Sequence, residues 1–132
     1  MKKIAFALFA LLTVSLTSCG PSISNETLQG KWNYIRVRNP HASPPDSVNS
    51  VTLQIEKPYI EFTTKDSLII HWDGRILSHG TFKLDGRNIL YKEILTDNST
   101  REFPFYIESL EGKKVIFSTK GEDGSEVTAV KQ

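Results

Sequence analysis

The side chains best suited to catalysis or metal binding are few in this sequence, and they are scattered. Three histidines stand at His41, His71 and His79, and their spacing matches no zinc, calcium-loop or nucleophile motif. If Asp73-Gly74 forms a two-residue turn, His79 lies opposite Leu68, so the two strand histidines are not cross-strand neighbours. Carboxylate pairs are too unspecific to assign acid–base roles. We therefore expect no metal, no cofactor and no enzymatic activity.

A few other side chains carry weaker hints of chemistry. Arg36 and Arg38 share one face of the first predicted strand, where they either meet an anion or simply keep the surface soluble. Ser47 and Ser67 each follow an aspartate and precede an aliphatic residue. These triplets resemble the O-glycosylation sites of proteins exported by Bacteroidetes-type bacteria, so both serines are candidate modification sites.

The single cysteine, Cys19, follows a segment that is typical of a secretory signal peptide. Lys2 and Lys3 supply the positive start, and Ile4 to Leu12 form an apolar run too short for a spanning helix, which needs about 20 residues. The sequence Leu-Thr-Ser-Cys at 16–19 resembles the bacterial lipobox, where a peptidase cuts before a cysteine that carries diacylglycerol. The alternative is an ordinary signal peptide that happens to end beside a cysteine.

An unpaired cysteine in a secreted protein calls for an explanation, and acylation supplies one. We expect residues 1–18 to be removed and Cys19 to carry two or three acyl chains such as palmitate, enough for stable anchoring. Residues 19–27 are predicted to be the lipidated cysteine and a flexible tether, and 28–132 the folded domain. The tether has no acidic run, which by family resemblance implies an outer-membrane lipoprotein that faces the periplasm.

The chain that remains after cleavage has 114 residues, which suits one domain. Without Lys2 and Lys3 it holds 14 basic and 15 acidic side chains, a net charge of −1. A nucleic-acid-binding surface would show a basic excess. We therefore expect no nucleic-acid partner.

The domain has the residue alternation and turn spacing of an all-β fold. Val51, Leu53 and Ile55 alternate with polar residues, the period of a half-buried strand. Asp73-Gly74 and Asp85-Gly86 favour the tight turns that match strand twist. The predicted strands are 30–38, 51–63 with a break near Pro58, 67–72, 75–84, 87–96, 101–109, 113–120 and 125–131. Eight antiparallel strands suffice to close a small meander β-barrel.

One proline-rich segment, residues 39–50, is predicted to be a loop that projects from one end of the barrel. Binding residues often lie on such loops, so His41, Pro44 and Pro45 are candidate contacts for a ligand or a partner. A solvated connector without a function is the alternative.

Three pieces of sequence combine into a family resemblance. Gly30-Lys31-Trp32 opens the domain, Tyr59 to Phe62 is followed by Lys65-Asp66, and Gly80 to Leu90 contains a Gly-Thr-Phe hairpin start that includes Phe82. Together they resemble the lipocalin-like domains of small lipoproteins from Bacteroidetes-type bacteria. The resemblance covers nearly all of the mature chain and implies a lipocalin-like barrel.

The resemblance also implies a structural role for Gly30, Trp32, Gly80 and Phe82. In lipocalins the tryptophan of the first strand packs across the closed end of the barrel, under an arginine from the last strand. Here the last strand offers Lys131 instead. The stem of a lysine can lie over an indole, although a planar guanidinium stacks better.

The expected function follows from what fills the barrel. Phe82, Phe103, Phe105 and Phe117 are bulky inner residues that leave little empty volume, so we expect a small apolar ligand at the open end, near residues 39–50. The leading hypothesis is a lipid-anchored cell-envelope binding module. Several strands are apolar on both faces, which indicates a docking surface. The alternative is therefore a protein-interaction or inhibitor module that uses this outer face or the loop.

Overall fold

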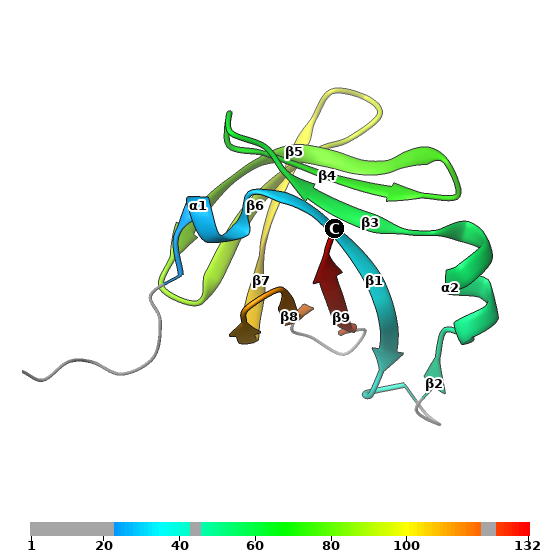
Figure 1. The fold of residues 1–132 in the computed structure, drawn as a ribbon. Coiled ribbons are helices and arrows are strands. Elements are labelled where there is room, and N and C mark those ends of the chain that lie inside the picture. Colours follow the sequence, from blue (N-terminus) through cyan, green and yellow to red (C-terminus); the bar gives the residue numbers. More distant parts are fainter. Residues whose placement is uncertain (1–22, 43–45, 120–123) are drawn as a thin grey trace, which may run out of the picture.

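The computed structural model describes residues 23–42, 46–119 and 124–132, and its strands wrap into a barrel (Figure 1). The described residues form two short helices, α1 (Asn25–Leu28) and α2 (Ser50–Glu56). They also form the strands β1 (Gly30–Asn39), β2 (Asp46–Ser47), β3 (Tyr59–Phe62), β4 (Ser67–Trp72), β5 (Arg75–Asp85), β6 (Asn88–Ile94), β7 (Thr100–Glu111), β8 (Lys114–Thr119) and β9 (Glu126–Lys131).

The sheet is a closed antiparallel meander. From β3 to β9 each strand pairs with the next one along the chain, and β1 pairs with β3 on one side. On its other side β1 pairs with β9, so the sheet closes on itself. The two-residue β2 lies beside the end of β1 and adds to a barrel of eight strands. The predicted fold class is confirmed, and closure removes the free strand edges that favour aggregation.

The two ends of the barrel differ. At one end, which we call the closed end, lie α1 and the tight β3–β4, β5–β6 and β7–β8 connections, and Asn25 Nδ2 donates a hydrogen bond to Asp66 Oδ1 at 2.9 Å. At the other end, the open end, lie the β4–β5 turn, the β6–β7 connection, β2 and α2. The described residues of the predicted loop at 39–50 thus belong to the open end, although Asp46 and Ser47 form β2 and Ser50 begins α2.

Residues 51–56 were predicted to be a strand, and this prediction is wrong because they form α2. The side-chain oxygen of Asn49 accepts a hydrogen bond from the Val51 amide at 2.7 Å and caps the helix start. Lys57, with φ of 47°, ends the helix in the left-handed conformation. Only the second part of the predicted strand, from Tyr59 onward, is β-structure.

The apolar residues of α2 also lie differently from those of a half-buried strand. Leu53 is 7 % exposed and packs into the core, whereas Val51 and Ile55 are 56 % and 70 % exposed. The latter two are four residues apart and therefore share the outer face of the helix. Three alternating apolar residues fit either element, and the capping residues decide between them.

Helix α1 corrects the predicted tether in the same way. Ser24 Oγ accepts a hydrogen bond from the Thr27 amide at 3.2 Å, and Thr27 Oγ1 accepts one from the Ser24 amide at 3.1 Å, which makes a capping box. Leu28 is fully buried, and Ile23 packs against the core. The folded domain therefore includes residues 23–27.

The β4–β5 hairpin contains the predicted turn and an unpredicted bulge. Asp73 and Gly74 both have positive φ, 56° and 77°, as a two-residue type I′ turn requires. Leu77 is an extra residue in β5, so His79 pairs with Ile69 and not with Leu68 as predicted. The extra residue shifts the register of everything beyond it by one position.

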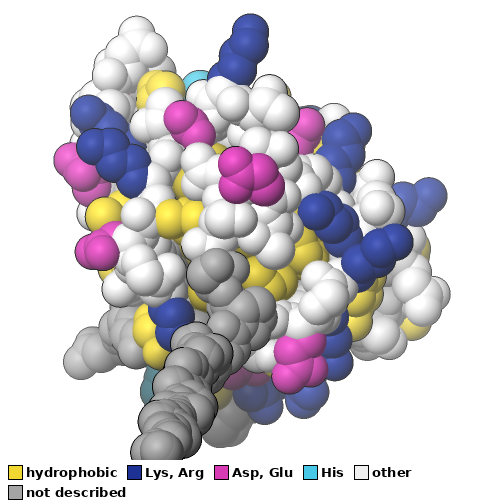
Figure 2. All heavy atoms as spheres, turned by 60° about the vertical axis from the view of Figure 1, so that its left-hand side comes forward, with side chains coloured by type: hydrophobic (Ala, Val, Ile, Leu, Met, Phe, Trp, Pro, Cys, Tyr) yellow, Lys and Arg dark blue, Asp and Glu magenta, His cyan; other side chains and the backbone are white. Residues whose placement is uncertain are grey.

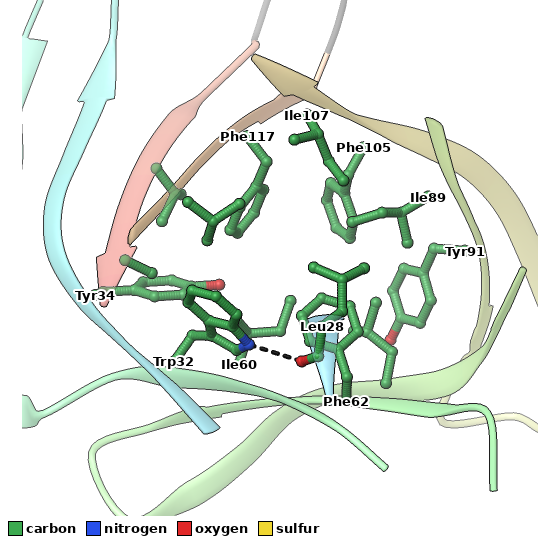
Figure 3. Packing of buried hydrophobic residues seen from close by; sticks show 14 of the residues in the cluster. Leu28, Trp32, Tyr34, Ile60, Phe62, Ile89, Tyr91, Phe105, Ile107 and Phe117 are labelled. Carbon is green, nitrogen blue, oxygen red and sulfur yellow. Dashed lines mark hydrogen bonds between the residues drawn. The ribbon is translucent and has the colours of Figure 1, made fainter. Parts of the chain in front are cut away.

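Hydrophobic side chains from all eight barrel strands fill the interior (Figure 3). Aromatic rings of five strands form a continuous series across it, with neighbouring ring centroids 5.5–6.2 Å apart. The series runs through Trp72, Tyr34, Phe117, Phe105 and Tyr91. At this level of the barrel the interior is occupied by packed rings.

The predicted inner set of phenylalanines is confirmed. Phe82, Phe105 and Phe117 are at most 5 % exposed, and Phe103 is partly buried against them. Phe82 packs edge-on to Phe62, 5.2 Å between centroids, and so belongs to the part of the core nearer the closed end.

Candidate functional site

Trp32 and Lys131 fasten α1 to the closed end. The Trp32 indole is fully buried, and its Nε1 donates a hydrogen bond to the Leu28 carbonyl at 2.7 Å (Figure 3). Lys131 Nζ lies 5.3 Å from the centre of the indole ring and donates to the Thr27 carbonyl at 3.3 Å. Both contacts satisfy carbonyls at the end of a helix, which otherwise lack partners. The lysine thus lies over the tryptophan as predicted, and both residues hold the end of α1.

Two glycines of the predicted signature have stereochemical reasons to be glycine. Gly30 has φ of 121°, and a Cβ atom there would lie 3.0 Å from Lys131 Cε. At Gly80 a Cβ atom would lie 1.9 Å from the backbone oxygen of Lys92 on the neighbouring strand. A methyl group does not fit at that distance, so Gly80 allows β5 and β6 to approach closely.

A polar network links β5, β6 and β7 near the open end. Glu93, whose side chain is 12 % exposed, accepts hydrogen bonds from Ser78 Oγ at 2.6 Å and from Arg101 Nη2 at 2.7 Å. Ser78 Oγ also shares a hydrogen bond with the Tyr91 hydroxyl, 2.6 Å away. The mostly buried carboxylate is therefore fully paired.

Burial controls the acidity of two phenols in the barrel. It raises the pKa of Tyr91 to about 12, with a further increase from Glu93 and a partial offset by the Ser78 hydrogen bond. Burial also raises the pKa of Tyr34, and the nearby Tyr91 phenol adds to the effect. Both phenols are neutral in the physiological range, and so the core carries no phenolate charge.

One opening of the surface lies between α2 and the β4–β5 hairpin. We call this cavity of about 400 Å³ the open-end groove; it is lined by Glu56, Trp72, Asp73, Arg75, Ile76 and Leu77. Trp72 Nε1 donates a hydrogen bond to the Glu56 carboxylate, and the Asp73 amide donates to the Glu56 carbonyl at 2.9 Å. The end of α2 is thus fixed to the hairpin turn.

The open-end groove combines an aromatic wall with exposed aliphatic side chains. Ile76 and Leu77 are 58 % and 64 % exposed, and Trp72 packs on its other side against Tyr34 of the core. Arg75, with 83 % of its side chain exposed, adds a charge at the rim. Apolar pockets with a few polar groups are the usual form of small-molecule sites, and exposed apolar side chains that cluster often mark them.

Of the predicted loop residues, His41 does not line this groove. Cys19, Pro44 and Pro45 lie outside the described residues. His41 lines a separate cavity of about 190 Å³, with polar neighbours that include Glu108 and Ser118. The described lining of the groove comes from α2 and the β4–β5 hairpin.

The remaining candidates are dispersed over the barrel. Ser47 is exposed in β2, and Ser67 is half-buried at the start of β4. Arg38 forms an ion pair with Glu126 at 2.6 Å, so its charge is already balanced, while Arg36 is exposed. The structure gives no shared anion site to the two arginines.

The histidines remain separate, as the sequence indicates. His71 stacks on Tyr59, with ring centroids 4.2 Å apart, and its Nε2 lies 3.5 Å from Glu61 Oε1. Within residues 23–42, 46–119 and 124–132, no group of three or more His, Cys, Asp or Glu is placed to hold a metal ion. In the same part of the chain, no helix has both the length and the apolar character to cross a membrane.

Sequence reasoning missed the groove because α2 was predicted to be a strand and the bulge in β5 was not predicted. Glu56 reaches Trp72 only through the helical form of α2, and Leu77 is exposed only through the bulge. A usable signal was the Trp-Asp-Gly-Arg-Ile-Leu run, which places two large aliphatic residues directly after a tight turn.

A comparison of the sequence with models of known protein families, and with curated proteins, finds no match. The resemblance to lipocalin-like lipoproteins therefore depends on the sequence motifs alone, which include those at Gly30, Gly80 and Cys19. The function that it implies is a proposal.

Proposed function

We propose that this protein is a lipid-anchored binding module of the cell envelope, of lipocalin-like type, and that it takes a small apolar ligand at the open end of its barrel. The open-end groove carries the proposal. It is the place where an aromatic wall, exposed aliphatic side chains and a few polar groups meet at the end of a closed barrel.

The packed interior supports a site at the groove and not deep in the barrel. The ring series from Trp72 to Tyr91 occupies the space that a deeply bound ligand would need. A volume of about 400 Å³ suits a short acyl chain or one aromatic ring system. The Trp72 ring is held by Glu56 and Tyr34, so this wall is formed before a ligand arrives.

The anchor is proposed on sequence grounds. The lipobox-like sequence before Cys19 and the lack of any cysteine partner support acylation at that residue. A Cys19→Ala chain should lose acylation and either enter the soluble periplasmic fraction or remain as an uncleaved precursor. Lipid labelling that persists in this variant would refute the anchor.

The ligand site is tested by titrating a naphthalene sulfonate dye into the soluble Cys19→Ala chain. We expect one saturable site, and a Leu77→Asp substitution should weaken it about tenfold or more, because burying a leucine side chain is worth about 1.5–3 kcal/mol. Leu90→Asp is the matched control: Leu90 is 41 % exposed and lies on β6, outside the groove. Equal affinities of the two variants would rule out the groove as the site.

A second function, docking to an envelope protein, is favoured by the outer face of α2. Val51 and Ile55 are both more than half exposed on this face, and such residues are costly on a surface without a partner. If the wild-type chain binds no apolar probe at a saturable site, docking to an envelope protein becomes the better supported of the two functions.

A further inference from the structure

The way in which α1 is held leaves little chain between the domain and Cys19. Ile23 packs against the core, Ser24 caps α1, and Leu28 is fully buried. Asn25 is bonded to the β3–β4 connection through Asp66. The folded domain is thus fixed up to Ile23, at its closed end.

The covalent length of the chain then limits how far this end can be from an acyl anchor. Only residues 20–22 separate Ile23 from Cys19. Four peptide steps at full extension span at most about 14 Å. A diacylglyceryl group on Cys19 sits at the lipid–water interface, so the start of the domain stays within this distance of the head groups.

The open end lies much farther away. Strand β7 runs from the open end to the closed end over its 12 residues. With a rise of about 3.3 Å per residue and a strand tilt of about 40°, it spans about 30 Å along the barrel axis. The α1 end and the open-end groove are therefore separated by roughly the height of the barrel.

We propose that the closed end of the barrel is a membrane-apposed surface and that the open-end groove faces away from the membrane that holds the anchor. The inference rests on the proposed acylation of Cys19 and adds an orientation to it. The partner of this surface is a lipid head-group layer.

Geometry, and not charge, sets this orientation. The closed-end connections carry Lys65, Arg87 and Lys113, but also Asp66, and the adjoining strand ends carry Asp85 and Glu111. Figure 2 brings the α1 side of Figure 1 forward and shows basic and acidic side chains interspersed on that face. Because the signs are mixed, attraction to anionic lipids is weak, and the short connection to Cys19 has to hold the surface in place.

The orientation has a consequence for the proposed ligand. A groove that faces away from the anchoring bilayer does not draw an apolar molecule directly from that bilayer. It exchanges the ligand with the aqueous compartment, or with a partner on the far side.

The single cysteine makes a direct test feasible. In the acylated full chain, Lys113→Cys and Thr96→Cys each introduce one free thiol, on exposed turns of the closed and the open end respectively. Each variant is labelled with a fluorescent maleimide, its acylation is verified by mass, and it is reconstituted into phosphatidylethanolamine–phosphatidylglycerol vesicles that contain a head-group nitroxide lipid. The label at residue 113 should lose most of its fluorescence, and the label at residue 96 should lose little.

A second variant separates the tether from the surface itself. About 20 Gly and Ser residues inserted between Ser22 and Ile23 add a flexible span of about 25 Å and should relieve most of the quenching at residue 113. Equal quenching at both positions, stronger quenching at residue 96, or quenching at 113 that ignores the insertion would each overturn the orientation. A chain whose mass shows no acyl group would instead overturn the proposed anchor, so the two failures are distinguishable.

Discussion

Replacement of Trp32 by alanine tests whether the closed end is held by the contacts described above. The indole is fully buried, and the loss of a buried tryptophan side chain costs about 3–5 kcal/mol. The Leu28 carbonyl would also lose its donor, which adds about 1 kcal/mol. Since small domains have only about 5–15 kcal/mol of stability, Trp32→Ala should lower the melting temperature by about 12 °C or more, if the chain folds at all.

Thermal unfolding followed by circular dichroism measures this loss, and two variants divide it into its parts. Trp32→Phe keeps an aromatic ring but removes the Nε1 donor, so it should cost less than Trp32→Ala. Lys131→Ala should cost at most about 1 kcal/mol, because the ammonium group covers the ring and bonds Thr27 in a partly buried position. A Trp32→Ala protein that melts within a degree or two of wild type would refute the role of this tryptophan in closing the barrel.

Three further predictions follow from the core. Gly80→Ala should lower the free energy of unfolding by about 3 kcal/mol or more, because the methyl group would meet the Lys92 carbonyl. Gly86→Ala should cost about 1 kcal/mol, because no atom lies within 4 Å of its new Cβ and only its φ is unfavourable. Urea unfolding of both variants checks the difference. Phe105→Ala should lower the free energy of unfolding by about 3–5 kcal/mol and leave the affinity of the open-end groove for a dye unchanged, as melting curves with and without dye would show. A stable variant with an enlarged dye site would instead mean that the barrel is hollow. Burial raises the pKa of Tyr91 from about 10 to about 12, so the stability that its protonated hydroxyl contributes is complete below pH 10 and is lost as the pH rises through 12. The melting temperature should therefore fall over this window, and it should fall less steeply in Tyr91→Phe. Parallel curves for the two proteins would contradict the burial of the hydroxyl.

The barrel was predictable because its signals are local and repeated. Asp-Gly pairs mark the β4–β5 and β5–β6 turns, and each strand that follows them alternates between inner and outer residues. The order of the strands then follows from short connections, which make chain neighbours sheet neighbours. The pairing of β1 with β9 is the one long-range contact that closure requires.

The two helices could not be recognised by periodicity. Four residues of α1 and seven of α2 are too few for a helical pattern to stand out, and their polarity resembles that of a tether and a strand. The usable signals were the caps: Ser24 before Thr27, and Asn49 before Val51.

The site was less predictable than the fold because it depends on register. Leu77 adds one residue to β5, and no property of the sequence places a bulge there. The groove also needs Glu56 beside Trp72. This is a contact between the last residue of α2 and the last residue of β4, which are 16 positions apart in the sequence. The predicted loop and the proposed groove lie at the same end of the barrel, but the described lining of the groove comes from α2 and the β4–β5 hairpin.

The most direct test of the proposed ligand site uses the two indole groups of the wild-type sequence as reporters. In a ¹H–¹⁵N NMR spectrum of the Cys19→Ala chain, the indole N–H of Trp72, bonded to Glu56 in the groove, and that of Trp32, bonded to Leu28 at the closed end, give separate signals. Titration with a naphthalene sulfonate dye should shift the Trp72 signal with saturation and leave the Trp32 signal in place. A spectrum in which neither signal moves at a dye excess, or in which only Trp32 responds, would contradict an apolar ligand site at the open end.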